Sequence, residues 1–194
     1  MKISAILMLV FVSSCSVKNT KNAESTGYLE LRTSDSLLHS ENRLTYFGNL
    51  LFTGKLLEIN EGDTLMYSEY VDGKKHGKEM IFHSKGIPKE ERCYESGQKT
   101  GEHRFWWENG RLKFIYHYKN DELDGNVKSW NETGQISGDF NYVNGREEGL
   151  QRAWFPNGEV QANYVAKNNR KYGITGVKNC QTNESTLNGI GKEQ

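Results

Sequence analysis

The chain has 194 residues, of which 35% are apolar, and its 20 glycines raise that share to the level of ordinary globular proteins, which excludes a disordered chain. Lys and Arg total 25, and so do Asp and Glu; without a basic excess, nucleic-acid binding is disfavoured. High glycine, only 2 prolines and an aromatic set of 8 Phe, 10 Tyr and 4 Trp indicate a turn-rich all-β protein with a thin core.

Residues 1–14 are predicted to be a lipoprotein signal peptide, cleaved before Cys15. Lys2 precedes an apolar run from Ile3 to Val12, about half the length of a membrane-spanning helix. The letters VSSC that end at Cys15 resemble a bacterial lipobox, whose cysteine is acylated, although the usual first Leu is Val here. Cys15 is therefore the predicted lipidation site. An ordinary signal peptide with an incidental cysteine is the alternative.

Residues 15–27 are then the lipidated cysteine and a flexible tether. No Asp follows Cys15, and by resemblance to enterobacterial sorting rules this favours the outer membrane, with the chain facing the periplasm. We expect an envelope protein held to the membrane by its lipid anchor.

Residues 28–61 are off the repeat period described next and are predicted to be an N-terminal cap that contains short strands and a degenerate repeat. Such a cap would protect the edge of an open sheet, where unpaired strands invite aggregation.

A 24-residue repeat occupies residues 62–176. One series recurs at this spacing: Gly77, Gly101, Gly125, Gly149 and Gly173. A second series contains the hairpin-forming pairs Asn109-Gly110 and Asn157-Gly158 in register with Gly62, Gly86 and Gly134. A third predicts turns with positive φ at Gly73, Gly97, Asp121, Gly145 and Asn169.

Between the turns, apolar and polar residues alternate as they do in strands. Leu112, Phe114, Tyr116 and Tyr118 are every second residue of one segment. Each unit is therefore predicted to be two antiparallel strands, and the chain an elongated open antiparallel sheet of tandem 24-residue β-hairpins. Adjacent strands lie about 4.8 Å apart, so each unit should lengthen the sheet by roughly 10 Å.

The unit from Tyr70 to Gly77 (YVDGKKHG), followed by Phe82 and Gly86, resembles a MORN repeat. The bacterial variant found in antitoxin-like proteins is the closer match. This resemblance implies a hairpin-repeat fold and, through the antitoxin label, neutralisation of a toxin by direct contact. Because the chain carries an export signal and most antitoxins act in the cytoplasm, that role is the third choice. Residues 177–194 are predicted to be a polar C-terminal tail.

Two aromatic series recur and are predicted to be structural, each stacking on its copies in neighbouring hairpins. They are Phe82, Trp106, Trp130 and Trp154, and Tyr116, Phe140 and Tyr164. The positions next to the first series, and their alternate neighbours, are predicted to point to the opposite face, which varies between units. On that face, the candidate partner-binding residues are His83, Phe105, Trp107 and Phe155. Cover by the N-terminal segment or a second wall of a flattened barrel is the alternative for this face.

No catalytic motif is present, so an enzyme is not expected, and neither is a cofactor. The five histidines, among them His103 and His117, are interpreted as solvated or turn residues, and no metal site is expected. Glu91, Glu102 and similar residues are interpreted as partners in cross-strand charge pairs. Cys93 is expected to be buried and not to pair with Cys180, which lies more than three units away.

The leading hypothesis is a non-enzymatic protein–protein interaction scaffold in a bacterial cell envelope, with an envelope protein as partner. A glycan- or cell-wall-binding module that uses the aromatic strips is the second hypothesis.

Overall fold

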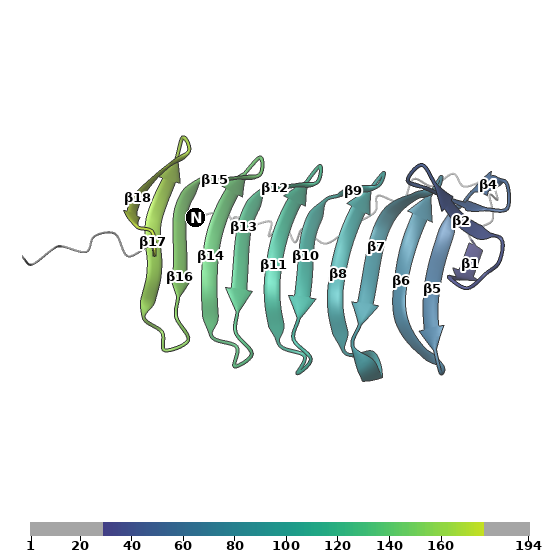
Figure 1. Ribbon diagram of the computed structural model, residues 1–194, viewed down its shortest axis with the longest axis horizontal. Coiled ribbons are helices and arrows are strands. Elements are labelled where there is room, and N and C mark those ends of the chain that lie inside the picture. The colour runs from purple at the N-terminus through teal and green to yellow at the C-terminus, as the bar shows by residue number, and fades with distance from the viewer. Residues whose placement is uncertain (1–28, 177–194) are drawn as a thin grey trace, which may run out of the picture.

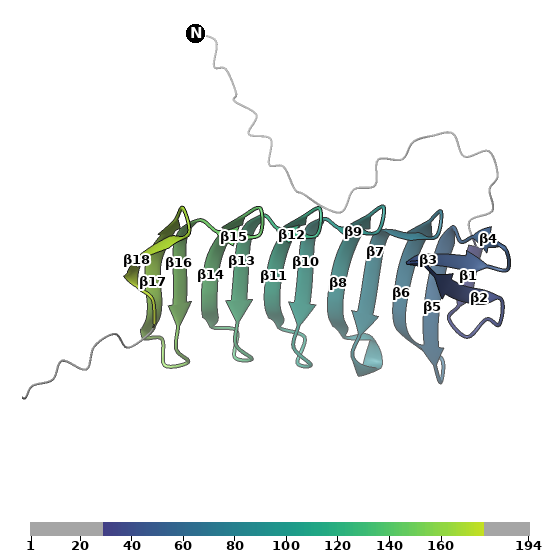
Figure 2. The ribbon, with the colours of Figure 1, turned by 45° about the horizontal axis from the view of Figure 1, so that its top comes forward.

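The computed structural model describes residues 29–176, which form a row of β-hairpins along one axis (Figures 1 and 2). The predicted signal peptide, Cys15, the tether and the tail with Cys180 lie outside the described residues. Within residues 29–176, the one helix is a short 3-10 turn, η1 (Ser84–Gly86). No helix in this range has the length and apolarity that crossing a bilayer requires. The fold is all-β, as predicted.

Twelve strands follow one another across the sheet. In spatial order they are β1 (Leu29–Arg32), β5 (Gly54–Asn60), β6 (Asp63–Val71), β7 (Lys74–Phe82), β8 (Pro88–Glu95), β10 (Gly101–Trp106), β11 (Leu112–Lys119), β13 (Gly125–Trp130), β14 (Ile136–Val143), β16 (Gly149–Trp154), β17 (Val160–Lys167) and β18 (Arg170–Ile174). From β5 onward every described neighbour is antiparallel, whereas β1 pairs with β5 in parallel. The sheet is therefore open and mixed at its N-terminal edge.

The predicted turns lie where the glycines and asparagines place them. Gly110 and Gly158 have φ of 77° and 85° in the loops that end β10 and β16. At the opposite end of the hairpins, Gly97, Asp121 and Asn169 have φ of 88°, 68° and 61°. These left-handed conformations favour Gly, Asn and Asp, which explains why these residue types recur there.

The first glycine series marks a different feature, a break in alternate strands. Three two-residue strands, β9 (Gln98–Lys99), β12 (Glu122–Leu123) and β15 (Arg146–Glu147), come just before β10, β13 and β16. At each break a glycine has positive φ: 68° at Gly101, 121° at Gly125 and 83° at Gly149. Across the first of these breaks the pairing moves from Tyr94 with Lys99 to Glu91 with Arg104, so two extra residues are accommodated there, as in a larger β-bulge.

The N-terminal end carries a separate small sheet of β2 (Leu38–Glu41), β3 (Leu44–Phe47) and β4 (Leu50–Leu51). It is tied to the turn after β6, because Thr45 N donates to Gly73 O and Gly73 N donates to Phe52 O, both at 2.8 Å. Phe52 is fully buried and its ring packs edge-on against Tyr70, with ring centres 5.7 Å apart.

Candidate functional site

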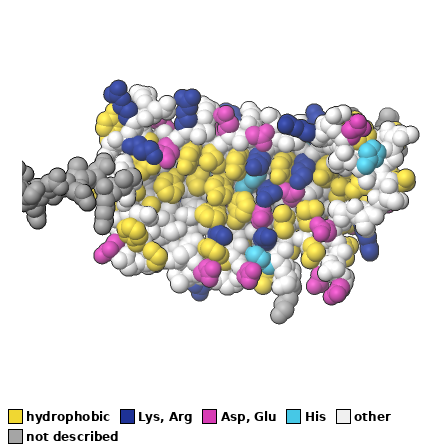
Figure 3. Space-filling model, in the orientation of Figure 1, with side chains coloured by type: hydrophobic (Ala, Val, Ile, Leu, Met, Phe, Trp, Pro, Cys, Tyr) yellow, Lys and Arg dark blue, Asp and Glu magenta, His cyan; other side chains and the backbone are white. Residues whose placement is uncertain are grey.

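The sheet has two faces of different character. We call one the aromatic face, which carries Phe105, Phe114, Tyr116 and Tyr118. The other, the charged face, carries cross-strand ion pairs such as Lys78 with Glu91 at 2.8 Å, and on it His117 Nε2 lies 3.3 Å from a carboxylate oxygen of Glu102. Figure 3 shows hydrophobic side chains gathered in a band that follows the long axis of the sheet.

Phe105 lies on the face opposite the Phe82–Trp154 series, as predicted, but it shares this face with the recurrent tyrosines. Its ring centre lies 5.5 Å from that of Tyr116, so the variable position 105 and the recurrent tyrosine share one face. The Phe82–Trp154 series lies at strand ends with a register shift, and its described members point the other way. Phe82 contacts Tyr67, and Trp154 lies beside Arg152, on the charged face.

A groove of about 560 Å³ opens at the loop end of three hairpins. It gathers His83, Phe105 and Trp107, three of the four predicted partner-binding residues. Phe155 is not among the lining residues and is exposed in the corresponding loop two repeats further on. The groove also contains residues that were not predicted to bind a partner, namely Lys89, Glu90, Trp106, Glu108, Asn109, Lys113, Phe114 and Glu132.

Two of the groove residues also hold neighbouring hairpins together. His83 Nε2 lies 3.2 Å from Trp106 O, and Trp107 Nε1 donates to Trp130 O at 3.1 Å. His83 and Trp107 are one repeat apart, so each reaches the same backbone position of the next hairpin. The ammonium of Lys113 lies 3.9 Å from the Trp107 ring centre, a cation–π contact that orders the indole.

A continuous strip of rings leads from the groove across the aromatic face. Ring centres are 6.4 Å apart for Phe105 and Phe114, and 6.2 Å apart for Tyr116 and Tyr118. The strip continues through His103, 4.6 Å from Tyr118, to Tyr94 at 6.1 Å. Most of these side chains are half-buried, so they present ring surface to solvent beside the groove.

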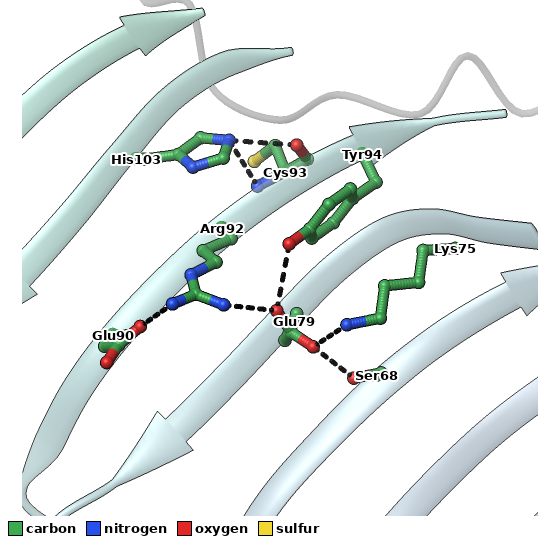
Figure 4. A network of polar contacts seen from close by, with 8 residues as sticks. All are labelled: Ser68, Lys75, Glu79, Glu90, Arg92, Cys93, Tyr94 and His103. Carbon is green, nitrogen blue, oxygen red and sulfur yellow. Dashed lines mark hydrogen bonds and ion pairs between the residues drawn. The ribbon is translucent and has the colours of Figure 1, made fainter. Parts of the chain in front are cut away.

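A buried polar cluster ends the strip (Figure 4). The carboxylate of Glu79, which is 2% exposed, accepts hydrogen bonds from Ser68 at 2.9 Å and from Tyr94 at 3.1 Å. It also forms ion pairs with Lys75 and, at 3.2 Å, with Arg92. Burial alone would raise the pKa of Glu79, but the hydrogen bonds and positive charges outweigh it and lower the pKa. Burial and the nearby carboxylate raise the pKa of Tyr94 to about 12.

His103 is the residue that sequence reasoning placed wrongly. It is 1% exposed rather than solvated, and its Nε2 lies 3.2 Å from Cys93 N and 3.0 Å from Cys93 O. Burial lowers the pKa of His103, which favours the neutral form of the ring. The signal that could have found it is its repeat phase, shared with the buried Glu79, Val127 and Gln151.

The structure also gives the outcome of the other predictions about glycines, Cys93 and charged residues. Gly77 and Gly173 have φ of 94° and 124°, in line with the other members of their series. Cys93 is buried, as expected. Glu91 makes the predicted cross-strand charge pairs, with Lys78 and Arg104, whereas Glu102 pairs with Arg104 of its own strand. Within residues 29–176, no group of three or more His, Cys, Asp or Glu side chains is placed to hold a metal ion.

A single-layer sheet made of tandem hairpins, with a solvent-facing groove and ring strip, defines a β-hairpin repeat protein. The family described as the MORN repeat variant matches the sequence at residues 99–120 and 123–144. Each match covers one hairpin, β10 with β11 and β13 with β14. The two hairpins of residues 99–144 are therefore MORN repeat variants, and repeats of this family are generally of a binding type. None of the curated proteins matches the sequence.

Proposed function

We propose that this repeat protein is a lipid-anchored scaffold of the cell envelope that binds a protein partner through the groove and the adjoining ring strip. The groove carries the proposal, because it brings Phe105, Trp107 and Phe114 together at one solvent-facing place. Protein interfaces are enriched in aromatic residues, and a few such anchors supply most of the binding energy. The partner would be another envelope protein, and a toxin is included because the repeat resembles the variant found in antitoxin-like proteins.

The groove also has polar groups that can fix the orientation of a partner. Glu90, Glu108 and Glu132 line it together with Lys89 and Lys113. Glu90 is already paired with Arg92, and the Lys113 ammonium lies over Trp107. A mixed rim of this kind around an apolar centre is the usual arrangement of a protein-binding surface.

The test uses substitutions taken from the chain's own repeats. Phe105→Ser copies Ser129, and Trp107→His copies His83, which occupies the same repeat position and can make the same backbone contact. The double variant should therefore fold while losing two of the aromatic rings that line the groove. Phe155→His is the matched control, because Phe155 has the same repeat phase as Trp107 but lies outside the groove.

The measurement is crosslinking of the acylated protein in its own envelope, followed by identification of the captured proteins. We expect a partner that is recovered with the unmodified chain and with Phe155→His, and lost with the double variant. Equal recovery of the partner with the unmodified chain, Phe155→His and the double variant would show that the groove does not bind it. Unchanged β-type circular dichroism establishes that the double variant is folded.

A glycan is the second candidate ligand, because the groove sets the amide of Asn109 and the carboxylates of Glu108 and Glu132 beside aromatic rings. It predicts a change in tryptophan fluorescence when envelope polysaccharide is added. A flat titration up to millimolar sugar would remove this candidate.

The anchor has its own test. Cys15→Ser should move the protein from the membrane fraction to the soluble fraction, since several acyl chains contribute roughly 0.8 kcal/mol for each buried CH₂ group. Retention of the variant on the membrane would contradict acylation at Cys15.

A further inference from the structure

The last described strand, β18, is an open edge of the sheet. It pairs with β17 through residues from Arg170 to Ile174, and no described strand lies on its other side. Figures 1 and 2 show it at one end of the row. All five of its residues are exposed. The backbone groups on the outer side of such a strand are a template for another strand.

Next to this edge, the charged face carries exposed apolar side chains instead of ion pairs. Leu150, Val165 and Tyr172 lie opposite one another across β16, β17 and β18. They are 41%, 43% and 57% exposed, and Ile174, two residues further along β18, is 62% exposed. The row therefore runs perpendicular to the strands and ends at the open edge.

We infer that β18 pairs with β18 of a second copy of this chain, antiparallel and centred on Tyr172. In that register Tyr172 lies opposite its own counterpart, and the apolar row continues through the partner's Val165 and Leu150. A backbone ladder and a shared apolar row would then form together, whereas an unrelated strand would supply only the ladder.

The charges of β18 fit this register. Arg170 would lie opposite Ile174 of the other copy, and Lys171 would lie opposite Gly173, whose lack of a side chain leaves room. The two Arg170 residues would then be separated by roughly 14 Å along the strands, beyond the Debye length of about 10 Å at 0.1 M salt. Lys171 is already paired with Glu147 at 2.7 Å on the aromatic face. A parallel arrangement would instead place Arg170 beside Arg170.

Such a dimer has a two-fold axis perpendicular to the sheet, so the aromatic faces of both copies point the same way. Two grooves would then lie on one surface, and a partner that reaches both would gain from multivalent binding. The pairing itself does not rest on the groove. The double variant Phe105→Ser/Trp107→His should remain a dimer whether or not it binds a partner.

Position-specific disulfide formation tests the register. The full chain, in mild detergent, carries Cys15→Ser and Cys180→Ser, so that Cys93, which is buried, is its one native cysteine. Tyr172→Cys in this background should crosslink into a dimer under mild oxidation, because directly opposed residues have Cα atoms about 4.5–5.5 Å apart. Ile174→Cys should not, since its counterpart would lie roughly 14 Å away.

Sedimentation measurements supply the second readout. The unmodified chain should be a dimer, Tyr172→Lys a monomer, and Val143→Lys still a dimer, because Val143 is similarly exposed but lies on β14, away from the edge. A monomeric unmodified chain, or equal crosslinking at positions 172 and 174, would overturn the inference. A dimer that forms only after residues 177–194 are removed would also overturn it and would assign the edge to that segment. A ladder of higher oligomers would indicate end-to-end pairing and overturn it as well.

Discussion

Gln151 makes with the backbone of Asn141 the contact that His103 makes with the backbone of Cys93 two repeats earlier. Gln151 Nε2 donates to Asn141 O at 2.8 Å, and its Oε1 accepts from Asn141 N at 3.0 Å. Each of the two residues lies two positions after a glycine at which the strand is broken, Gly101 for His103 and Gly149 for Gln151. The break interrupts the ladder of backbone hydrogen bonds, and a buried polar side chain takes the place of the missing partners.

The equivalence predicts that glutamine can replace the histidine. His103→Gln should change the free energy of unfolding by less than about 1 kcal/mol, whereas His103→Ala should lower it by about 2 to 3 kcal/mol through lost hydrogen bonds to a buried backbone. Urea unfolding followed by circular dichroism measures both values. Equal losses for the two variants would show that the ring acts through packing alone.

His103 should also make stability depend on pH. Burial lowers its pKa in the folded protein, while in the unfolded chain it titrates near its ordinary value of 6.5. Below about pH 6.5 the unfolded chain therefore binds a proton that the folded chain does not, and stability falls as the pH falls. Urea midpoints at pH 7.5 and pH 5.5 should differ in the unmodified chain and converge in His103→Gln. The same slope in both proteins would assign the effect to other groups.

Glu79 should contribute stability at neutral pH. Its lowered pKa means that the stabilisation is present above the ordinary value of 4.5 and is lost as the pH falls through the lower, folded-state value. Glu79→Gln should cost about 3 kcal/mol at pH 7, the low end for a broken buried ion pair, because Lys75 and Arg92 keep about a third of their surface in water.

The matched control for Glu79→Gln is Glu95→Gln, since Glu95 is exposed at the end of β8. Chemical unfolding at pH 7 and at pH 3 should show the difference between the two variants shrinking in acid. A pH-independent cost for Glu79→Gln would mean that shape, not charge, is what the site requires.

Gly54 is predicted to control the N-terminal edge. A Cβ atom at this residue would lie 2.0 Å from Leu29 O, which is backbone, so Gly54→Ala should detach β1 from β5. Gly62→Ala is the control, because Gly62 also has positive φ but has nothing within 4 Å of the Cβ position. Hydrogen exchange at Leu31 should become fast in the first variant only. Slow exchange in Gly54→Ala would show that β1 can shift and stay paired.

The turns and the repeat were predictable because they depend on local backbone chemistry. Asn109-Gly110 and Asp121 specify their conformations within a few residues, and the 24-residue period repeats the information. The hairpin sheet follows from these signals together with the alternation from Leu112 to Tyr118. None of this requires knowledge of contacts between distant residues.

The face on which each side chain lies was less predictable, because the alternation of side chains between the two faces is interrupted at each register shift. Trp106 pairs with Leu112 while Phe105 pairs with Phe114, so Lys113 is skipped. An alternation counted along one strand therefore cannot be carried over to the next. Lys113 and Glu90 of the groove come from neighbouring strands and have no local signal that links them to Trp107. The parallel pairing of β1 with β5 joins two segments that do not follow the 24-residue period, and no sequence pattern predicted it.

A sheet one layer thick has no shared interior, since each hairpin packs only against the hairpins on either side. Stability is then close to a sum of unit and nearest-neighbour contributions, as in other repeat proteins. Loss or gain of one 24-residue unit would change the length of the ring strip without rebuilding a core. The number of repeats in such a chain therefore sets the length of its binding surface, which changes in steps of roughly 10 Å.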